Sequence, residues 1–143
     1  MTVLVDANIL LYAKFADFPQ HERAVSWLDH TLNSPQPVGI PWVSLSAFLR
    51  IATNHRVFAD PLPIELAVDQ VNKWCEPRVV WHPEPEEQFA SVFAELLMTY
   101  NCSANLVADA YIAALALEHG LTVVSTDADF ARFPSVPSLN PLV

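Results

Sequence analysis

Three aspartates in this sequence occupy positions where a carboxylate could do chemistry as well as face water. Asp6 directly follows the apolar run VLV, Asp127 follows TVVST, and Asp109 is the only charged residue between Tyr100 and Leu117. An ionised carboxylate is costly to bury among alanines and leucines unless another group favours its charge. If the three acids meet, their repulsion raises at least one pKa unless a cation lies between them. Such a set suits Mg²⁺ or Mn²⁺, which prefer oxygen ligands and can activate a bound water.

The same aspartates also have ordinary structural interpretations. Asp6 and Asp127 each precede a helical pattern, and aspartate is a favoured N-cap because its oxygen accepts free N–H groups of the first turn. Asp129 has the position of a solvated acid in a first helical turn. For Asp109 the upstream segment SANL, residues 103–106, offers Ser103 or Asn105 as better caps. The sequence therefore leaves both interpretations open for Asp6 and Asp127, and it favours a partner for Asp109.

Valine-rich runs alternate with longer helical patterns, and most of the 12 prolines separate them. Strands are predicted near residues 3–5, 38–40, 78–81 and 121–125. Helices are predicted over residues 8–14, 20–33, 43–53, 64–74, 86–100 and 108–119, with a short helical turn over 127–133. The alternation predicts a three-layer α/β/α fold around a central parallel sheet. Since parallel strands open their carboxyl ends on one side, Asp6 and Asp127 should face one crevice. That Asp109 reaches it is a hypothesis.

The composition predicts one globular domain over residues 1–143 and excludes several kinds of site. The chain is 52% hydrophobic and carries a net charge of −9, which argues against a broad basic surface for nucleic acid. Only two glycines are present, so a P-loop and a dinucleotide-binding loop are excluded. Any contact with nucleic acid must therefore be local or carried by bound cations.

The cysteines and the first residues bear on the compartment. Cys75 and Cys102 are far apart and form no CxxC pattern, which predicts two buried free thiols. The start MTVLVDANILLYAK has no basic region before its apolar run and includes Asp6. It matches neither a signal peptide nor a membrane span. We expect a soluble cytoplasmic protein that does not associate with membranes.

A phosphotransfer receiver or a haloacid-dehalogenase-like phosphatase would also place an aspartate after the first strand. The phosphatases need a second acid two residues later, where this chain has Asn8. Both classes need a lysine near the end of a later strand, and neither Lys14 nor Lys73, the only lysines, has that position. These classes are disfavoured.

Four segments together resemble PIN-domain endoribonucleases, and within them the VapC-type toxins of bacterial toxin–antitoxin operons. The segments are VLVDANILLYA, PWVSLSAFLRIATN, DAYIAALALEHGLTVVSTDADFARFPSV and the tail LNPL, which is similar to a subgroup common in mycobacteria. The resemblance implies a PIN-like fold and cleavage of single-stranded RNA that depends on Mg²⁺ or Mn²⁺. The residues it implies for catalysis and metal binding are Asp6, Asp109 and Asp127, with Asp129 as an additional candidate ligand. Asn8 and Thr126 are implied as polar supports.

One position departs from the family pattern. The family usually has a further acid, most often glutamate, where this chain has Ala47, and no acid occurs between residues 29 and 60. Either Asp129 compensates, or Ser44 or Ser46 helps through water, or the activity is low. The alternative function is a PIN-like module that binds RNA or an antitoxin with weak or no nuclease activity.

The resemblance also implies partners. Toxins of this type form homodimers and are silenced by a VapB-type antitoxin whose C-terminal segment lies over the active site, often with an arginine on the carboxylates. Arg50 and Arg56, which flank His55, form the densest basic stretch and are candidate RNA contacts, although a solvated or salt-bridged helix end is the alternative. The four tryptophans are expected in the core or at an interface rather than as base-stacking platforms: Trp27, Trp42, Trp74 and Trp81.

Overall fold

A five-stranded parallel sheet forms the centre of the computed structural model, which describes residues 1–143. The strand order is β3-β2-β1-β4-β5, and every neighbouring pair is parallel. The strands are β1 (Val3–Val5), β2 (Val38–Gly39), β3 (Val80–Trp81), β4 (Thr122–Val124) and β5 (Ser138–Leu139). The first strand therefore lies in the middle of the sheet, between β2 and β4.

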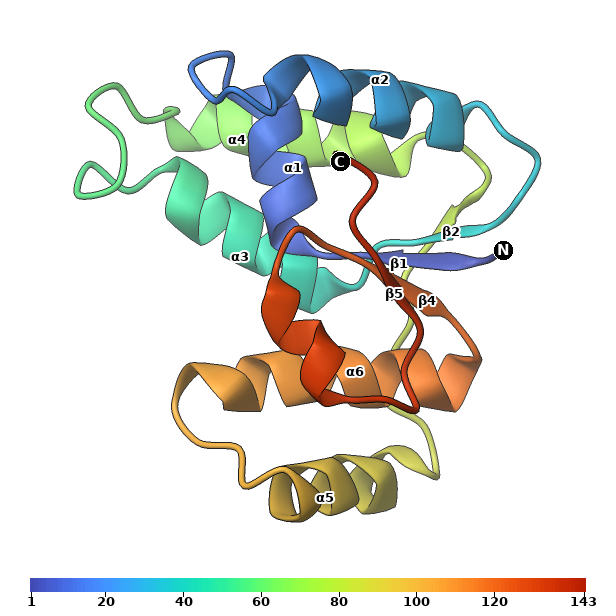
Figure 1. The fold of residues 1–143 in the computed structure, drawn as a ribbon. Helices are drawn as coiled ribbons and strands as arrows, with labels where there is room; N and C mark the ends of the chain where they lie inside the picture. Colours follow the sequence, from blue (N-terminus) through green and yellow to red (C-terminus); the bar gives the residue numbers. More distant parts are fainter.

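Helices cover both faces of this sheet. Figure 1 shows α1 to α4 on one side and α5 and α6 on the other. The helices are α1 (Ala7–Lys14), α2 (His21–Leu32), α3 (Trp42–Ala52), α4 (Ile64–Cys75), α5 (Phe89–Thr99) and α6 (Asn105–His119), with the short 3₁₀ helix η1 (Ala128–Arg132) packed on α6. The predicted three-layer α/β/α architecture is confirmed.

The strands divide the apolar core into two parts because successive side chains of a strand point to opposite faces. Val3 and Val5 pack in the cluster beneath α1 to α4, whereas Leu4 packs with α5 and α6. Phe48 lies edge-on against Trp74 in the first cluster, with ring centroids 4.8 Å apart. Burial on both faces explains why the strand sequences are continuously apolar rather than alternating.

One strand was missed, and several element boundaries differ from the sequence prediction, for example the start of α5 at Phe89 rather than at residue 86. Strand β5 was not predicted, because its two residues lie among prolines and are exposed, so no apolar run marks them. Helix α6 begins at Asn105 rather than at residue 108. Its N-cap position is Ala104, which has a φ of 52° and makes no side-chain capping bond, so the expectation of a cap by Ser103 or Asn105 is wrong.

The cysteines are also less buried than predicted. Cys75 and Cys102 are both free, as expected, but each is partly exposed. Both side chains lie at the margins of the two core clusters rather than inside them. No helix combines the length with the apolar character that a membrane crossing requires.

Replacement of Gly120 by alanine is expected to destabilise the fold by about 1 kcal/mol. Gly120 ends α6 with a φ of 68°, a left-handed conformation that a Cβ disfavours. An added Cβ would meet no atom within 4 Å, so the cost comes from the backbone alone. Urea unfolding of Gly120→Ala measures it. Gly120→Asn is the control and should lose less stability, because asparagine tolerates this conformation better. An equal loss in both variants would contradict the explanation.

Candidate active site

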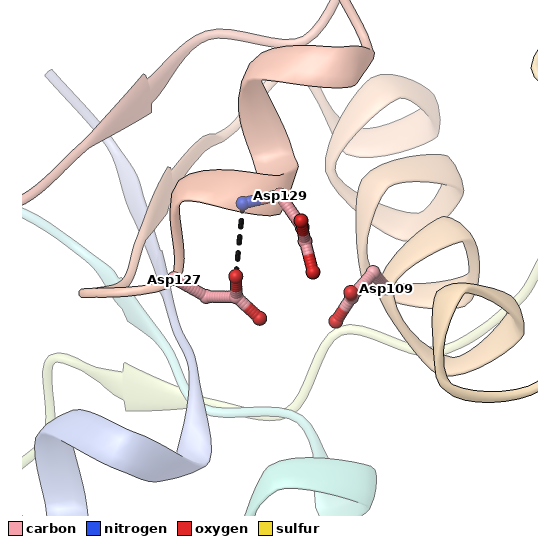
Figure 2. Close-up of side chains that lie close together, drawn as sticks. All are labelled: Asp109, Asp127 and Asp129. Atoms are coloured by element: carbon pink, nitrogen blue, oxygen red, sulfur yellow. Dashed lines mark hydrogen bonds between the residues drawn. The ribbon is translucent and has the colours of Figure 1, made fainter.

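Carboxylates from three separate segments gather at the carboxyl edge of the sheet. One carboxylate oxygen each from Asp109, Asp127 and Asp129 lie within 4.8 Å of one another. Figure 2 shows Asp109 reaching from α6 toward Asp127, which follows β4, and toward Asp129 in η1. Asp6, directly after β1, is outside this trio, but its charge acts on Asp109 and it shares a hydrogen-bond network with Asp127. The structure therefore brings the predicted acids to one region, with Asp129 inside the trio and Asp6 at its margin.

A single buried hydroxyl connects the two strands that carry these acids. Ser125 Oγ donates to Asp6 Oδ2 at 2.8 Å and accepts from the Asp127 backbone N–H at 3.0 Å. It also accepts from Asn8 Nδ2 at 2.9 Å. Sequence reasoning did not single out Ser125. The sequence feature that could have identified it is a polar residue at the end of a buried strand. A serine hydroxyl there can donate one hydrogen bond and accept two.

Asp6 and Asp127 act as helix caps and still belong to the acidic region. Asp6 Oδ1 accepts from the Ala7 backbone N–H at 2.8 Å, and Asp127 Oδ1 accepts from the Asp129 backbone N–H at 2.9 Å. In Figure 2 the second oxygen of Asp127 points toward Asp109. The two interpretations left open by the sequence are therefore compatible, because a carboxylate has two oxygens and a cap engages one of them.

Asn8 is bonded to Asp6, whereas Thr126 takes part in the network only through its backbone. Asn8 Nδ2 donates to Asp6 Oδ2 at 3.4 Å, and Asn8 Oδ1 accepts from the Thr126 backbone N–H at 3.3 Å. Thr126 thus contributes its backbone in this network. The amide of Asn8 links the start of α1 to the end of β4 and restricts the orientation of Asp6.

The electrostatics of the site favour a bound cation. Burial above all, then the charges of Asp127, Asp6 and Asp129, raise the pKa of Asp109 to about 6. Burial also raises the pKa of Asp6, with a further contribution from Asp127, against the lowering effect of the bonds from Ser125 and Ala7. An oxygen-only donor set whose members repel one another fits Mg²⁺ or Mn²⁺.

One cationic side chain of the protein reaches this group. Arg132 Nε lies 3.7 Å from Asp129 Oδ1, and the two side chains are 53% and 48% exposed. An ion pair this exposed is weak, because water screens it. Arg132 therefore leaves most of the repulsion among the acids uncompensated.

The position of the missing family acid has no carboxylate nearby on its own helix. Ala47 is partly exposed in α3, and Ser46 is exposed. Ser44 is 2% exposed, and its hydroxyl has no hydrogen-bond partner. Asp129, which was considered as a compensating acid, joins Asp109 and Asp127, and its compensating role stays a prediction.

The basic residues lie apart from the acids along the chain. Arg50 is in the last turn of α3, and Arg56 lies in the turn after it. Both are exposed and neither forms an ion pair, which matches the solvated form of the alternative and not the salt-bridged form. Trp42 is the first residue of α3, and Arg50 lies roughly 12 Å farther along the helix, at about 1.5 Å per residue. Their role as RNA contacts stays a prediction.

Comparisons with known proteins identify relatives of this chain. A model of the PIN domain family matches residues 3–136. The chain is 42% identical over 133 residues to ribonuclease VapC37 of Mycobacterium tuberculosis, which covers 93% of this chain and 92% of the relative. It is 35% identical over 140 residues to ribonuclease VapC33 of the same organism, with 98% of each covered.

Solved structures share the fold. VapBC2 from Rickettsia felis, bound to a promoter DNA fragment, superposes with a TM-score of 0.70 at 16% identity and 98% coverage of both chains. VapBC-1 from nontypeable Haemophilus influenzae gives a TM-score of 0.70 at 16% identity, with 100% of both chains covered.

Asp109→Asn is expected to stabilise the metal-free protein at pH 7.5 and to have no such effect at pH 3.5. The pKa of Asp109 is raised from 3.8 to about 6 in the folded protein. Between these pH values the folded state therefore holds a proton on this carboxyl more tightly than the unfolded state does. The stability of the unmodified protein therefore falls as the pH rises through this window and stays lower above it. Urea unfolding in EDTA at both pH values measures the effect.

The control for this experiment is Asp29→Asn, which removes an exposed carboxylate from α2. It should change the unfolding midpoint little at either pH. A stabilisation by Asp109→Asn that is equal at pH 7.5 and 3.5 would show that its carboxylate is not under electrostatic strain.

Proposed function

This chain belongs to the PIN-domain family, and we propose that it is a VapC-type endoribonuclease toxin of a type II toxin–antitoxin system. Relatives that are 42% and 35% identical over nearly their full lengths are ribonucleases by name. The match to the PIN model spans residues 3–136, and we treat residues 1–143 as a single PIN domain. The reaction we propose is hydrolysis of phosphodiester bonds in single-stranded regions of RNA.

The observation that carries the proposal is the group of carboxylates at the carboxyl edge of the sheet. Asp109, Asp127 and Asp129 present oxygens within 4.8 Å of one another, and we propose them, with Asp6, as the residues that hold a divalent cation. When bound, Mg²⁺ or Mn²⁺ supplies a Lewis acid that activates water and neutralises charge on the phosphodiester. Catalytic roles are proposed for Asp6, Asp109 and Asp127.

Asp6 and Asp109 differ in how firmly the protein holds their carboxylates. Asp6 is held on both oxygens, by Ala7 on one and by Ser125 and Asn8 on the other, so its carboxylate has a fixed orientation. Asp109, in contrast, receives no hydrogen bond that would lower its raised pKa. It is thus the member whose charge depends most on a cation. Fixed and adaptable ligands together let a site form with little rearrangement.

The alternative of a binding module without nuclease activity is not favoured. The observation in favour of that alternative is the alanine at position 47, where the family usually has an acid. Asp129 supplies a carboxylate to the group from another element, and the relatives with 34–42% identity carry ribonuclease names. We therefore propose that the alanine changes the ligand set rather than abolishing the activity.

The proposed partners follow from the family. The solved neighbours include toxin–antitoxin complexes, and we propose a VapB-type antitoxin as the partner that silences this chain. A homodimer is proposed as the assembly. The cytoplasm, where RNA is accessible, is the proposed site of action, and Arg50 and Arg56 remain candidate contacts for RNA phosphates.

Asp127→Asn is expected to reduce RNA cleavage by more than about 100-fold, because it removes a proposed ligand charge. The protein is purified free of antitoxin and assayed on single-stranded RNA with Mg²⁺ or Mn²⁺, and EDTA should abolish cleavage. Asp29→Asn is the matched control and should cut at the normal rate. Full cleavage by Asp127→Asn would contradict the assignment of the site, whereas no cleavage by the unmodified protein with either metal would support the binding module.

Mn²⁺ is expected to raise the thermal unfolding midpoint of the unmodified protein and to raise it little in Asp109→Asn. A ligand at ten times its Kd stabilises the folded state by about 1.4 kcal/mol. The shift should be smaller at pH 5.5 than at pH 7.5, because protons compete with the metal for the carboxylates. Calorimetry with and without EDTA measures the shifts. Equal shifts in both proteins would place the metal elsewhere.

A further inference from the structure

A cleft of aromatic and proline side chains lies at the same edge of the sheet as the acids. Its volume is about 260 Å³, and its walls include Pro41, Trp42, Pro83, Pro85 and Tyr111. We call it the aromatic cleft. Its lining includes one charged residue, a glutamate, and no lysine or arginine. A phosphate group would therefore find no cationic partner there.

The strand register places this cleft beside the acids. Leu4 of β1 pairs with Gly39 of β2, so Asp6 and Pro41 stand at the same level, two residues beyond this pair. Gly39 pairs in turn with Trp81 of β3, which brings Pro83 to that level. Neighbouring strands lie about 4.8 Å apart. The edge is thus acidic after β1 and β4, and aromatic after β2 and β3.

Helix α6 borders both regions. It contributes Asp109 to the acids and, two residues later, Tyr111 to the aromatic cleft. Tyr111 is held by the α5 rings Phe89 and Phe93, with centroids 4.9 Å and 5.8 Å away. Since residues two apart on a helix point to different sides, Tyr111 forms one wall of the cleft, fixed by its packing on α5, while Asp109 faces the other acids.

Trp42 also lines the cleft and is unusually exposed for its type. Its exposed fraction is 51%, whereas Trp74 is 7% exposed, so Trp42 is not a core residue, and its expected interface role stays a prediction. The ring of His82 lies against Trp42, with centroids 5.0 Å apart and planes 36° apart. His82 is itself fixed by a hydrogen bond between Nδ1 and the Ile40 carbonyl oxygen at 2.8 Å. Trp42 is thus supported on one side and open to solvent.

We propose that the aromatic cleft binds the base of a nucleotide next to the scissile phosphate, by stacking on Trp42. The proposal rests on the proposed ribonuclease function. Every base has a π-face, so stacking on an aromatic ring contributes affinity without sequence recognition. The chain has a net charge of −9 and only seven lysines and arginines, so phosphate contacts alone are a weak source of RNA affinity. His82 acts as a positioning residue for the Trp42 ring.

The test compares Trp42→Ala with Trp42→Phe in steady-state cleavage of single-stranded RNA with Mn²⁺. Trp42→Ala should raise KM about tenfold and leave kcat within about threefold, because a stacked base contributes to binding. Trp42→Phe keeps a ring and should recover most of the affinity. Met98→Ala, which removes an exposed apolar side chain from α5, is the control and should match the unmodified protein. Circular dichroism verifies that each variant is folded.

RNAs with a single abasic site, scanned across the cleavage position, add a second readout. One abasic position should weaken binding to the unmodified protein by the same factor as Trp42→Ala, and it should cause no further loss in that variant, since both remove one interaction. Additive losses at every position would overturn the proposal. So would an unchanged KM in Trp42→Ala, including the case in which that variant loses only its affinity for the antitoxin.

Fluorescence separates this proposal from the proposed function. If the unmodified protein cuts no RNA, single-stranded RNA is titrated into the protein in EDTA while tryptophan emission is recorded. Quenching that disappears in Trp42→Phe would support base binding in the cleft although the nuclease assignment fails. Quenching that is absent, or that persists in Trp42→Phe, would overturn the proposal.

Discussion

The repulsion among carboxylates that the fold holds together at one edge of the sheet is the constraint on which the rest of the structure depends. Asp109, Asp127 and Asp129 lie within 4.8 Å, Asp6 adds its charge, and one exposed arginine is their only cationic neighbour. Such an arrangement persists because the surrounding core fixes the segments that carry the acids. The unfavourable charge is then available to be balanced by a ligand, which is how binding sites differ from surfaces optimised for stability.

The sheet supplies that rigidity through its two central strands. β1 and β4 are buried on both faces, and the Asp6 backbone N–H continues their pairing by donating to the Val124 carbonyl at 3.0 Å. Ser125 then joins the first residues beyond the strands with a single hydroxyl. Water has little access to this junction, since Ser125 is 5% exposed. Its hydrogen bonds therefore hold the orientation of Asp6 more firmly than exposed bonds would.

Sequence reasoning predicted most elements and the meeting of Asp6 and Asp127 at one edge of the sheet, because buried parallel strands leave clear periodic patterns. That Asp109 joins them was a hypothesis, and the structure places Asp109 beside Asp127. Sequence reasoning did not predict β5, whose two exposed residues carry no apolar signal. It also treated capping and site membership as alternatives, whereas Asp127 does both with different oxygens. Ser125 and the exposed ring of Trp42 were missed for a related reason. Their importance comes from contacts across the sheet edge, between segments 40 to about 120 residues apart, which local patterns do not encode.

The central place of β1 also has a consequence for synthesis. β1 is made first, but its neighbour β4 spans residues 122–124, and the acids come from residues 6, 109, 127 and 129. During synthesis Asp6 therefore lacks its carboxylate neighbours until residues 109 to 129 have been made. The complete carboxylate group therefore cannot form from any local segment, and it arises only when folding brings residues 6 and 129 together across β1 and β4.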